Sequence, residues 1–379
     1  MTTPALFTPL TLRGVTLKNR IAVSPMCQYS ATDGVPNDWH FVHLGRFAIG
    51  GAGLVMVEAT AVEAEGRITH GDLGLWNDEQ QGRLARIAAF LKSQGAVPAI
   101  QIGHAGRKAS THRPFEGGHP ITTENARPGE SAWQTVAPSA IPFADGYHTP
   151  RALTVEEIHG LTAKFVDSAK RALAAGFEVL EIHGAHGYLL TEFLSPISNH
   201  RSDQYGGDFQ GRTRFLLETV EAVRAVWPDD KPLFVRLSTV DGTPGGWSLE
   251  DSVVLAGELK ARGVDVIDSS SGGLTPSMET ANRPAPLYQT PYAEAVRRDA
   301  GIATMAVGLI TQPQEAEAII ADGQADIVAL GRAMLENPNW AQDAKAALDP
   351  EHIGDDAWPL ATGYAVKSLK GFKAKRGLA

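Results

Sequence analysis

The chain has 379 residues, of which 43% are hydrophobic and 20% charged, a balance typical of a globular protein with a large core. Asp and Glu outnumber Lys and Arg by 43 to 34, and the formal net charge of −9 opposes general binding to nucleic acid or anionic membranes. The single cysteine excludes an intrachain disulfide and fits a reducing compartment. No basic segment followed by an apolar one opens the sequence, and no stretch approaches the roughly 20 apolar residues that span a bilayer. We therefore expect a cytoplasmic protein without a signal peptide or membrane anchor.

Short β-branched runs alternate with longer amphipathic segments along most of the chain. The runs are continuously apolar, as expected for strands buried on both faces of a parallel sheet. Several helical segments carry N-terminal capping signals, such as Thr154 with Glu157 and Ser248 with Asp251, and end at glycines. The predicted strands are residues 21–24, 54–59, 96–102, 179–183, 233–237, 264–268, 303–307 and 327–330, and the clearest helices are 78–94, 154–175, 211–226, 248–262 and 312–322.

Eight strand–helix units with right-handed crossovers close naturally into a (β/α)₈ TIM barrel. The alternative, an open doubly wound sheet, would place a glycine-rich phosphate turn after its first strand. This chain instead has Ser24-Pro25-Met26-Cys27 at that position. We therefore predict an α/β protein with a (β/α)₈ barrel that forms a single domain over residues 1–379.

Three segments depart from the regular alternation. Residues 5–20 are predicted to form a hairpin that turns near Arg13-Gly14 and plugs the bottom of the barrel. Residues 105–150 contain six prolines and little periodicity, and an insertion of that length after the third strand is typical of a lid or pocket wall. Residues 355–379 form a basic C-terminal tail.

A histidine pair lies at the predicted C-terminal end of the fourth strand, the edge where a parallel barrel holds its chemistry. His183 and His186 are three residues apart and could aim two imidazole N–H groups at one oxygen, which would polarise a carbonyl. Tyr188 follows and could supply a proton. Two hydrogen-bonded histidines that merely support the loop are the structural alternative. A metal site is the rival functional interpretation, but no third ligand has suitable spacing, so we predict no metal.

Other polar residues end the first, third and fifth strands. Cys27 could be a nucleophile or a small buried residue, and the neighbouring Tyr29 could be a packed aromatic. Gln101 offers a donor and an acceptor suited to the edge of a heterocycle. Arg236 is a cation within an apolar run and needs either an internal ion pair or an anionic ligand.

The seventh and eighth strands end in Gly308 and in Gly331-Arg332, where barrels of this kind commonly bind phosphate. With the preceding residues, this indicates a flat heterocycle whose phosphate tail crosses the barrel mouth. The sequence has no GxGxxG fingerprint, Walker A loop or Gly-x-Ser-x-Gly elbow. FMN therefore fits better than a tightly held dinucleotide.

The order of these motifs resembles the Old Yellow Enzyme family of FMN-dependent ene-reductases, and specifically its bacterial branch with a cysteine over the flavin. The likeness extends from about residue 6 to about residue 349. It is carried by residues 24–29, 57–59, 100–108, 183–188 and 198–207, and by 212–218.

The resemblance implies a role for each candidate residue. Cys27 would tune the flavin potential and touch substrate without forming a covalent bond, and Arg236 would face the N1/C2-carbonyl edge of the flavin. Ser24, Pro25, Met26 and Cys27 would line the isoalloxazine; Ala59, Gln101 and Arg236 would bind its ring; Gly308, Gly331 and Arg332 would hold its phosphate; and Tyr29, His183 and His186 would bind the substrate's activating group.

The implied mechanism is ping-pong. NADPH or NADH reduces non-covalently bound FMN, and an activated alkene, either an α,β-unsaturated carbonyl or a nitro compound, then takes hydride at its β-carbon. Tyr188 would protonate the α-carbon. The family also implies a homodimer or homotetramer, in which a C-terminal residue enters a neighbouring subunit's site; Trp358 and Lys367 are the candidates here.

Two other classes of function remain open from the residues themselves. A flavin-free, phosphate-binding isomerase or lyase would need a Lys or carboxylate at a strand end, for which Glu58 and Asp268 are the candidates. A flavin-binding module without catalysis would not need the histidine pair and tyrosine.

Overall fold

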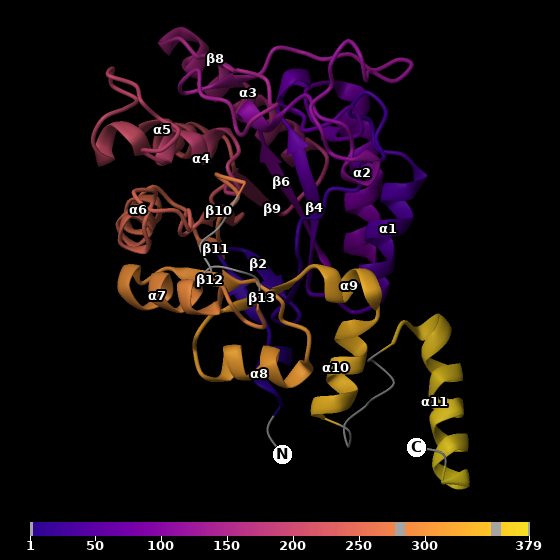
Figure 1. Ribbon diagram of the computed structural model, residues 1–379. Coiled ribbons are helices and arrows are strands. Elements are labelled where there is room, and N and C mark those ends of the chain that lie inside the picture. The colour runs from indigo at the N-terminus through magenta and orange to yellow at the C-terminus, as the bar shows by residue number, and fades with distance from the viewer. Residues whose placement is uncertain (1–2, 277–284, 350–357, 378–379) are drawn as a thin grey trace.

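The computed structural model describes residues 3–276, 285–349 and 358–377, and eight parallel strands form a closed ring at its centre (Figure 1). Each strand pairs with the next along the chain, and β13 returns to pair with β3. The predicted (β/α)₈ barrel is therefore confirmed. The eight strands are β3 (Ile21–Val23), β4 (Leu54–Ala61), β6 (Val97–Gly103), β9 (Val179–Gly184), β10 (Leu233–Ser238), β11 (Val266–Ser270), β12 (Ala303–Ala306) and β13 (Ile327–Leu330).

Helices surround this ring on the outside (Figure 1). The capping boxes predicted at Thr154 and Ser248 are both present and begin α3 and α6. Asn37 and Asn77 form two further boxes, which begin α1 and α2. The helices are α1 (Asp38–Ile49), α2 (Asp78–Ser93), α3 (Val155–Ala174), α4 (Leu189–Leu194), α5 (Phe209–Arg224), α6 (Leu249–Ala261), α7 (Thr290–Ala300), α8 (Pro313–Ala321), α9 (Arg332–Glu336), α10 (Trp340–Leu348) and α11 (Leu360–Arg376).

Burial on both faces explains the continuous apolar runs. Every residue of β6, β9 and β10 is buried, with one side chain set against the helices and the next inside the ring. The predicted hairpin is also present: β1 (Leu10–Leu12) pairs antiparallel with β2 (Val15–Leu17). Val15 and Leu17 pack in one cluster with Met56 and Phe234 from the strands, so the hairpin fills one end of the barrel.

The insertion after β6 is fastened to the barrel. Its only paired strand in the described residues is the short β7 (Val136–Ala137), which pairs with β8 (Arg151–Ala152). The guanidinium of Arg107 donates hydrogen bonds to the carbonyls of Ile141 and Pro142 within the insertion and to that of Leu274, which follows β11. These bonds hold the insertion against the strand ends.

The C-terminal tail, which the sequence indicated only as basic, contains helix α11. In Figure 1 it lies apart from the helices around the barrel, beyond residues 350–357, which are outside the described part. Leu360, Tyr364 and Phe372 expose their side chains on it. Within the described residues, no helix is long and apolar enough to cross a membrane.

Candidate active site

The strand ends bring the predicted residues together around two hollows. A cavity of about 200 Å³ is lined by His186, Arg236, Gly308, Gly331 and Arg332, among others. A smaller hollow is lined by Ala59, His183 and Tyr188. These residues come from five different strands, β4, β9, β10, β12 and β13, and lie at the mouth of the barrel, as expected for a site at this edge of a parallel barrel.

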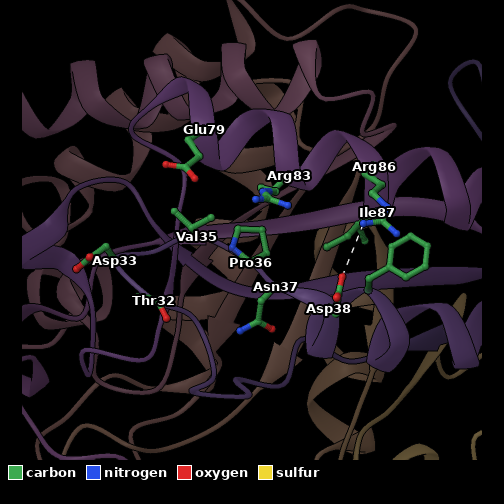
Figure 2. Close-up of a pocket in the computed structure, with 11 residues that line it drawn as sticks. Thr32, Asp33, Val35, Pro36, Asn37, Asp38, Glu79, Arg83, Arg86 and Ile87 are labelled. Carbon is green, nitrogen blue, oxygen red and sulfur yellow. Dashed lines mark ion pairs between the residues drawn. The ribbon is translucent and has the colours of Figure 1, made fainter.

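A larger groove lies elsewhere and contains none of these residues. It measures about 400 Å³ and runs between α2 and the segment that leads into α1 (Figure 2). Charged side chains line it, including Asp38 and Arg86, whose ion pair of 3.7 Å is largely exposed. The larger volume of this groove therefore does not identify the active site. We place the candidate active site at the barrel mouth, where the predicted residues lie.

The histidine pair ends β9, where the chain turns sharply. His186 adopts φ 62°, a left-handed conformation, and its backbone N–H donates to Ser238 Oγ at 2.8 Å. Its Nε2 lies 2.7 Å from Ser270 Oγ. The ring of His183 lies 5.2 Å, between centroids, from the rings of both His186 and Tyr188. The turn therefore gathers two imidazoles and a phenol in one small volume.

Both imidazoles are neutral at ordinary pH. Burial, followed by the positive charge of Arg236, lowers the pKa of His183 and of His186 well below the usual value. His183 Nδ1 is buried and has no hydrogen-bond partner among the described residues. A buried, unpaired ring nitrogen is costly unless a ligand or water pairs with it. The pair can thus offer neutral N–H donors to a bound oxygen.

Lys108 is a functional candidate that the sequence reasoning overlooked. Its ammonium donates to the carbonyls of His186 and Gly273 at 2.8 and 3.0 Å, and it lies 5.0 Å from the centre of the Tyr188 ring. Burial lowers the pKa of Lys108 to about 8. The sequence signal that could have found Lys108 is its position a few residues after the third strand. Nothing in the sequence linked it to the His186 turn, which is nearly 80 residues away.

Cys27 and Tyr29 lie on the segment that follows β3. Burial raises the pKa of the Cys27 thiol well above its usual value, and the carboxylates of Asp72 and Glu58 add to that shift. Cys27 is thus a thiol rather than the nucleophilic thiolate. Tyr29 adopts φ 51°, and its carbonyl accepts a hydrogen bond of 3.1 Å from Arg113 in the insertion.

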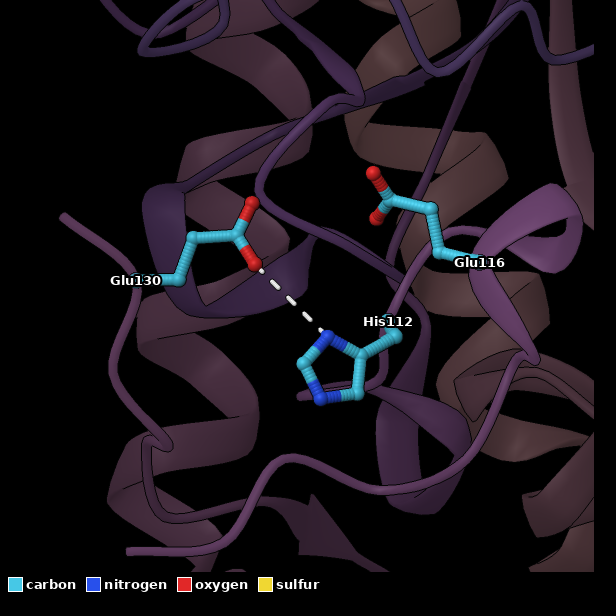
Figure 3. A group of neighbouring side chains, drawn as sticks. All are labelled: His112, Glu116 and Glu130. Atoms are coloured by element: carbon cyan, nitrogen blue, oxygen red, sulfur yellow. Dashed lines mark ion pairs between the residues drawn. The ribbon is translucent and has the colours of Figure 1, made fainter. Parts of the chain in front are cut away.

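An acid–base cluster in the insertion supports that contact. His112, Glu116 and Glu130 converge (Figure 3), and His112 Nδ1 lies 3.7 Å from a Glu130 oxygen. Three such side chains could suggest a metal. However, Arg113 pairs with both carboxylates and Arg127 pairs with Glu116, so two cations already balance two anions. We interpret the cluster as an ion-pair network that holds Arg113 against Tyr29.

Arg236 has the internal ion pair, one of the two partners that the sequence left open, and it also faces a cavity. Its Nε lies 3.1 Å from an Asp268 oxygen, which makes an internal ion pair. The same side chain also lines the cavity, and one terminal nitrogen lies 3.5 Å from Ser24 Oγ. Gln101 is buried, and its amide N–H donates to Glu181 at 2.8 Å. That bond fixes one amide hydrogen of Gln101 and leaves its oxygen available to a ligand.

The residues at the seventh and eighth strand ends fit a phosphate. Gly308 has φ 126°, and a Cβ there would come within 3.0 to 3.1 Å of Gln289, so only glycine suits this approach. Gly331 precedes the N-terminus of α9, whose first residue is the exposed Arg332. Gly308, Gly331 and Arg332 line the same cavity as Arg236, and two glycines with two guanidinium groups suit a flat heterocycle with a phosphate tail. The site therefore fits FMN.

Comparison with known proteins supports the same conclusion. A model of the NADH:flavin oxidoreductase / NADH oxidase family matches residues 5–351. An NADPH dehydrogenase of Geobacillus sp. (strain WCH70) is 47% identical over 345 residues, which cover 90% of this chain and 94% of the relative. An NADPH dehydrogenase of Bacillus cytotoxicus is 46% identical over 367 residues, covering 96% and 99%. The structure of morphinone reductase matches with a TM-score of 0.75 and 29% identity, over 91% of this chain and 90% of that one.

The chain therefore belongs to the NADH:flavin oxidoreductase / NADH oxidase family, and it is an oxidoreductase. Within that class it is of the Old Yellow Enzyme type, with FMN as cofactor and NAD(P)H as reductant. The resemblance to the Old Yellow Enzyme family drawn from the sequence motifs is confirmed, and the position of Cys27 over the flavin stays a prediction.

Proposed function

We propose that this protein is an ene-reductase, which reduces the C=C bond of α,β-unsaturated carbonyl or nitro compounds. The observation that carries this proposal is the cluster of His183, His186 and Tyr188, with ring centroids 5.2 Å apart at the mouth of a barrel suited to FMN. Such a constellation matches an electron-poor alkene, which needs activation of one oxygen and delivery of one proton.

His183 and His186 bind the activating oxygen in this proposal. Both are neutral, so each acts as an N–H donor and draws electron density from the β-carbon as negative charge develops on the oxygen. FMN, when bound, would supply the hydride-transfer chemistry between NAD(P)H and that β-carbon. Tyr188 protonates the α-carbon; burial raises its pKa well above the usual value, so the phenol keeps its proton until the carbon requires it.

The remaining residues orient cofactor and substrate. Arg236 would hold the N1/C2-carbonyl edge of a bound ring and offset negative charge there, and Ser24, Pro25, Met26, Ala59 and Gln101 would complete the ring site. Gly308, Gly331 and Arg332 bind the phosphate. Tyr29 contacts substrate, and Cys27 packs beside the ring as a thiol, in accord with its raised pKa. We further propose a single-domain chain that works in the cytoplasm as a homodimer or homotetramer.

The flavin-free isomerase is less well supported because both candidate carboxylates have structural partners. Glu58 accepts a hydrogen bond from the Gln28 backbone at 3.0 Å and lies 4.0 Å from His40. Asp268 pairs with Arg236.

Visible spectra recorded anaerobically test the proposal directly. The purified protein should show a flavin band that NADPH bleaches and that cyclohexenone restores. A colourless protein that takes up no added FMN would contradict the proposed site. Bleaching by NADPH without recovery on the enone would contradict the ene-reductase assignment while preserving the flavin.

A further inference from the structure

The interior of the barrel beneath the candidate flavin site contains two acids and one cation. Glu181 lies in the middle of β9, in register with Gln101 of the neighbouring β6. Arg236 of β10 is in register with Asp268 of β11. Neither Glu181 nor Asp268 has measurable exposure to solvent, and Arg236 is 6% exposed. Two carboxyl groups thus lie near a single guanidinium in a region that excludes water.

The contacts of the two acids differ. Asp268 forms an ion pair with the guanidinium, at 3.1 Å from Arg236 Nε, although neither of its oxygens accepts a hydrogen bond of good geometry from the described residues. Glu181 accepts one hydrogen bond, from the neutral amide of Gln101 at 2.8 Å, and its other oxygen is buried with no partner among the described residues. A buried carboxylate without a cation or a second donor is strongly disfavoured.

The electrostatics of the set place its extra proton on Glu181. Burial first, and then the charge of Asp268, raise the pKa of Glu181, while Arg236 and the Gln101 bond act in the opposite direction. Burial also raises the pKa of Asp268, against the attraction of Arg236. Since Asp268 has the direct ion pair, it keeps the charge and Glu181 keeps the proton.

We propose that at alkaline pH, where Glu181 is ionised in the oxidised protein, Glu181 takes up a proton from solvent when the bound flavin is reduced, so that the redox state of the cofactor and the protonation of the barrel interior are linked. The proposal rests on the function proposed above, in which Gln101 and Arg236 hold the flavin ring. Hydride from NAD(P)H would add two electrons to a bound ring and leave a negative charge beside Arg236. In a low-dielectric interior that charge disfavours a carboxylate nearby. Glu181 then binds one proton as an O–H group, and no other bond changes.

Other titratable groups approach the same region and must be separated from Glu181. His183 lies two residues after Glu181 on β9, and His186 lies just beyond the strand. Burial and the charge of Arg236 lower the pKa of both imidazoles well below the usual value, so neither titrates in the alkaline range. Lys108 faces these histidines from the insertion, and its pKa of about 8 lies within the range in which Glu181 would titrate. Another buried acid, Glu192 of α4, also has a raised pKa of about 8, but it accepts a hydrogen bond from the backbone N–H of Arg107 and does not contact the ring site. Glu192 is therefore a matched control.

The midpoint potential of the bound flavin, measured against pH, reports the number of protons taken up with the two electrons. One proton gives a slope of about 30 mV per pH unit, and a second proton doubles the slope to about 60 mV. The wild type should show the steeper slope on the alkaline side, where Glu181 ionises in the oxidised protein. Glu181→Gln, which retains an oxygen to accept the Gln101 bond, should keep the shallow slope throughout.

The controls decide between Glu181 and its neighbours. Glu192→Gln and Lys108→Met should both retain the steep segment. Asp268→Asn removes the competing charge, frees Arg236 to pair with Glu181 and should move the steep segment to lower pH. A wild type without a steep segment, or a Glu181→Gln variant that keeps one, would overturn the proposal.

A measurement without cofactor separates this inference from the proposed function. Infrared spectra of the apoprotein should show the carbonyl band of a buried protonated carboxyl group at neutral pH, and Glu181→Gln should lose that band. A protein that binds no FMN would contradict the proposed function, whereas the infrared result would still decide where the proton lies. An apoprotein band unchanged by Glu181→Gln would overturn the inference even if FMN binds.

Discussion

The substitution His183→Ala removes one donor of the imidazole pair. His183 is 4% exposed, is neutral, and offers a ring nitrogen that has no protein partner in the described structure. An uncharged donor held in a water-excluded site is worth more than in water, and loss of one such donor costs about 10²–10³ in rate, or about 2.7–4 kcal/mol of transition-state stabilisation. We expect alkene reduction to slow by this factor.

FMN binding should survive the same change, because His183 lies on the substrate side of the proposed site. The assay is kcat/KM for cyclohexenone with NADPH, together with the ratio of flavin to protein absorbance in the purified variant. His159→Ala is a suitable control, since that imidazole hydrogen-bonds Tyr205 on the outer face of the barrel at 3.0 Å. A His183→Ala enzyme that retains FMN and reduces the enone at the wild-type rate would refute the assigned role.

Three other substitutions test neighbouring parts of the site. Tyr188→Phe should slow reoxidation by the enone by about 10²–10⁴ and leave reduction by NADPH unchanged in stopped-flow traces; equal slowing of both half-reactions would contradict a proton-donor role. Because burial lowers the Lys108 pKa to about 8 from 10.5, the unfolded chain binds more protons between these values, and wild-type stability should rise by about 3 kcal/mol as the pH increases across them. Lys108→Met should lack this rise when the free energy of unfolding is measured by urea denaturation at several pH values. The same pH dependence in both proteins would contradict the lowered pKa of Lys108. Glu130→Gln weakens the ion pair that holds Arg113 against Tyr29; losing part of a charge-assisted bond of about 1.5–3 kcal/mol should raise KM for the enone about tenfold, and an unchanged KM would separate the network from the site.

The sequence by itself determined the barrel. A strand buried on both faces must be apolar at consecutive positions, so the runs that became β6, β9 and β10 were visible without knowledge of their partners. Helix starts were visible for a similar reason: a capping box such as that at Thr154 is satisfied within four residues of chain. Short-range hydrogen bonds and burial on both faces of a strand can therefore be predicted from local sequence.

The sequence also located the chemistry at the strand ends, but not the partners of each group. Arg236 could be predicted to need an anion, yet whether that anion was a ligand or a side chain depended on the register that sets Asp268 beside it. Lys108 reaches the His186 turn, and Arg113 reaches Tyr29, across separations of many residues. Helix α11 gave no amphipathic signal and was predicted only as a basic tail.

Closure of the barrel decided these contacts. It sets strands distant in sequence about one hydrogen-bonded spacing apart and removes the water between them. Composition shows that acids are plentiful, but only the closed ring places Glu181 where a single cation is already engaged. The charge state of a buried group depends on what surrounds it in space, and that environment exists only once the chain has folded.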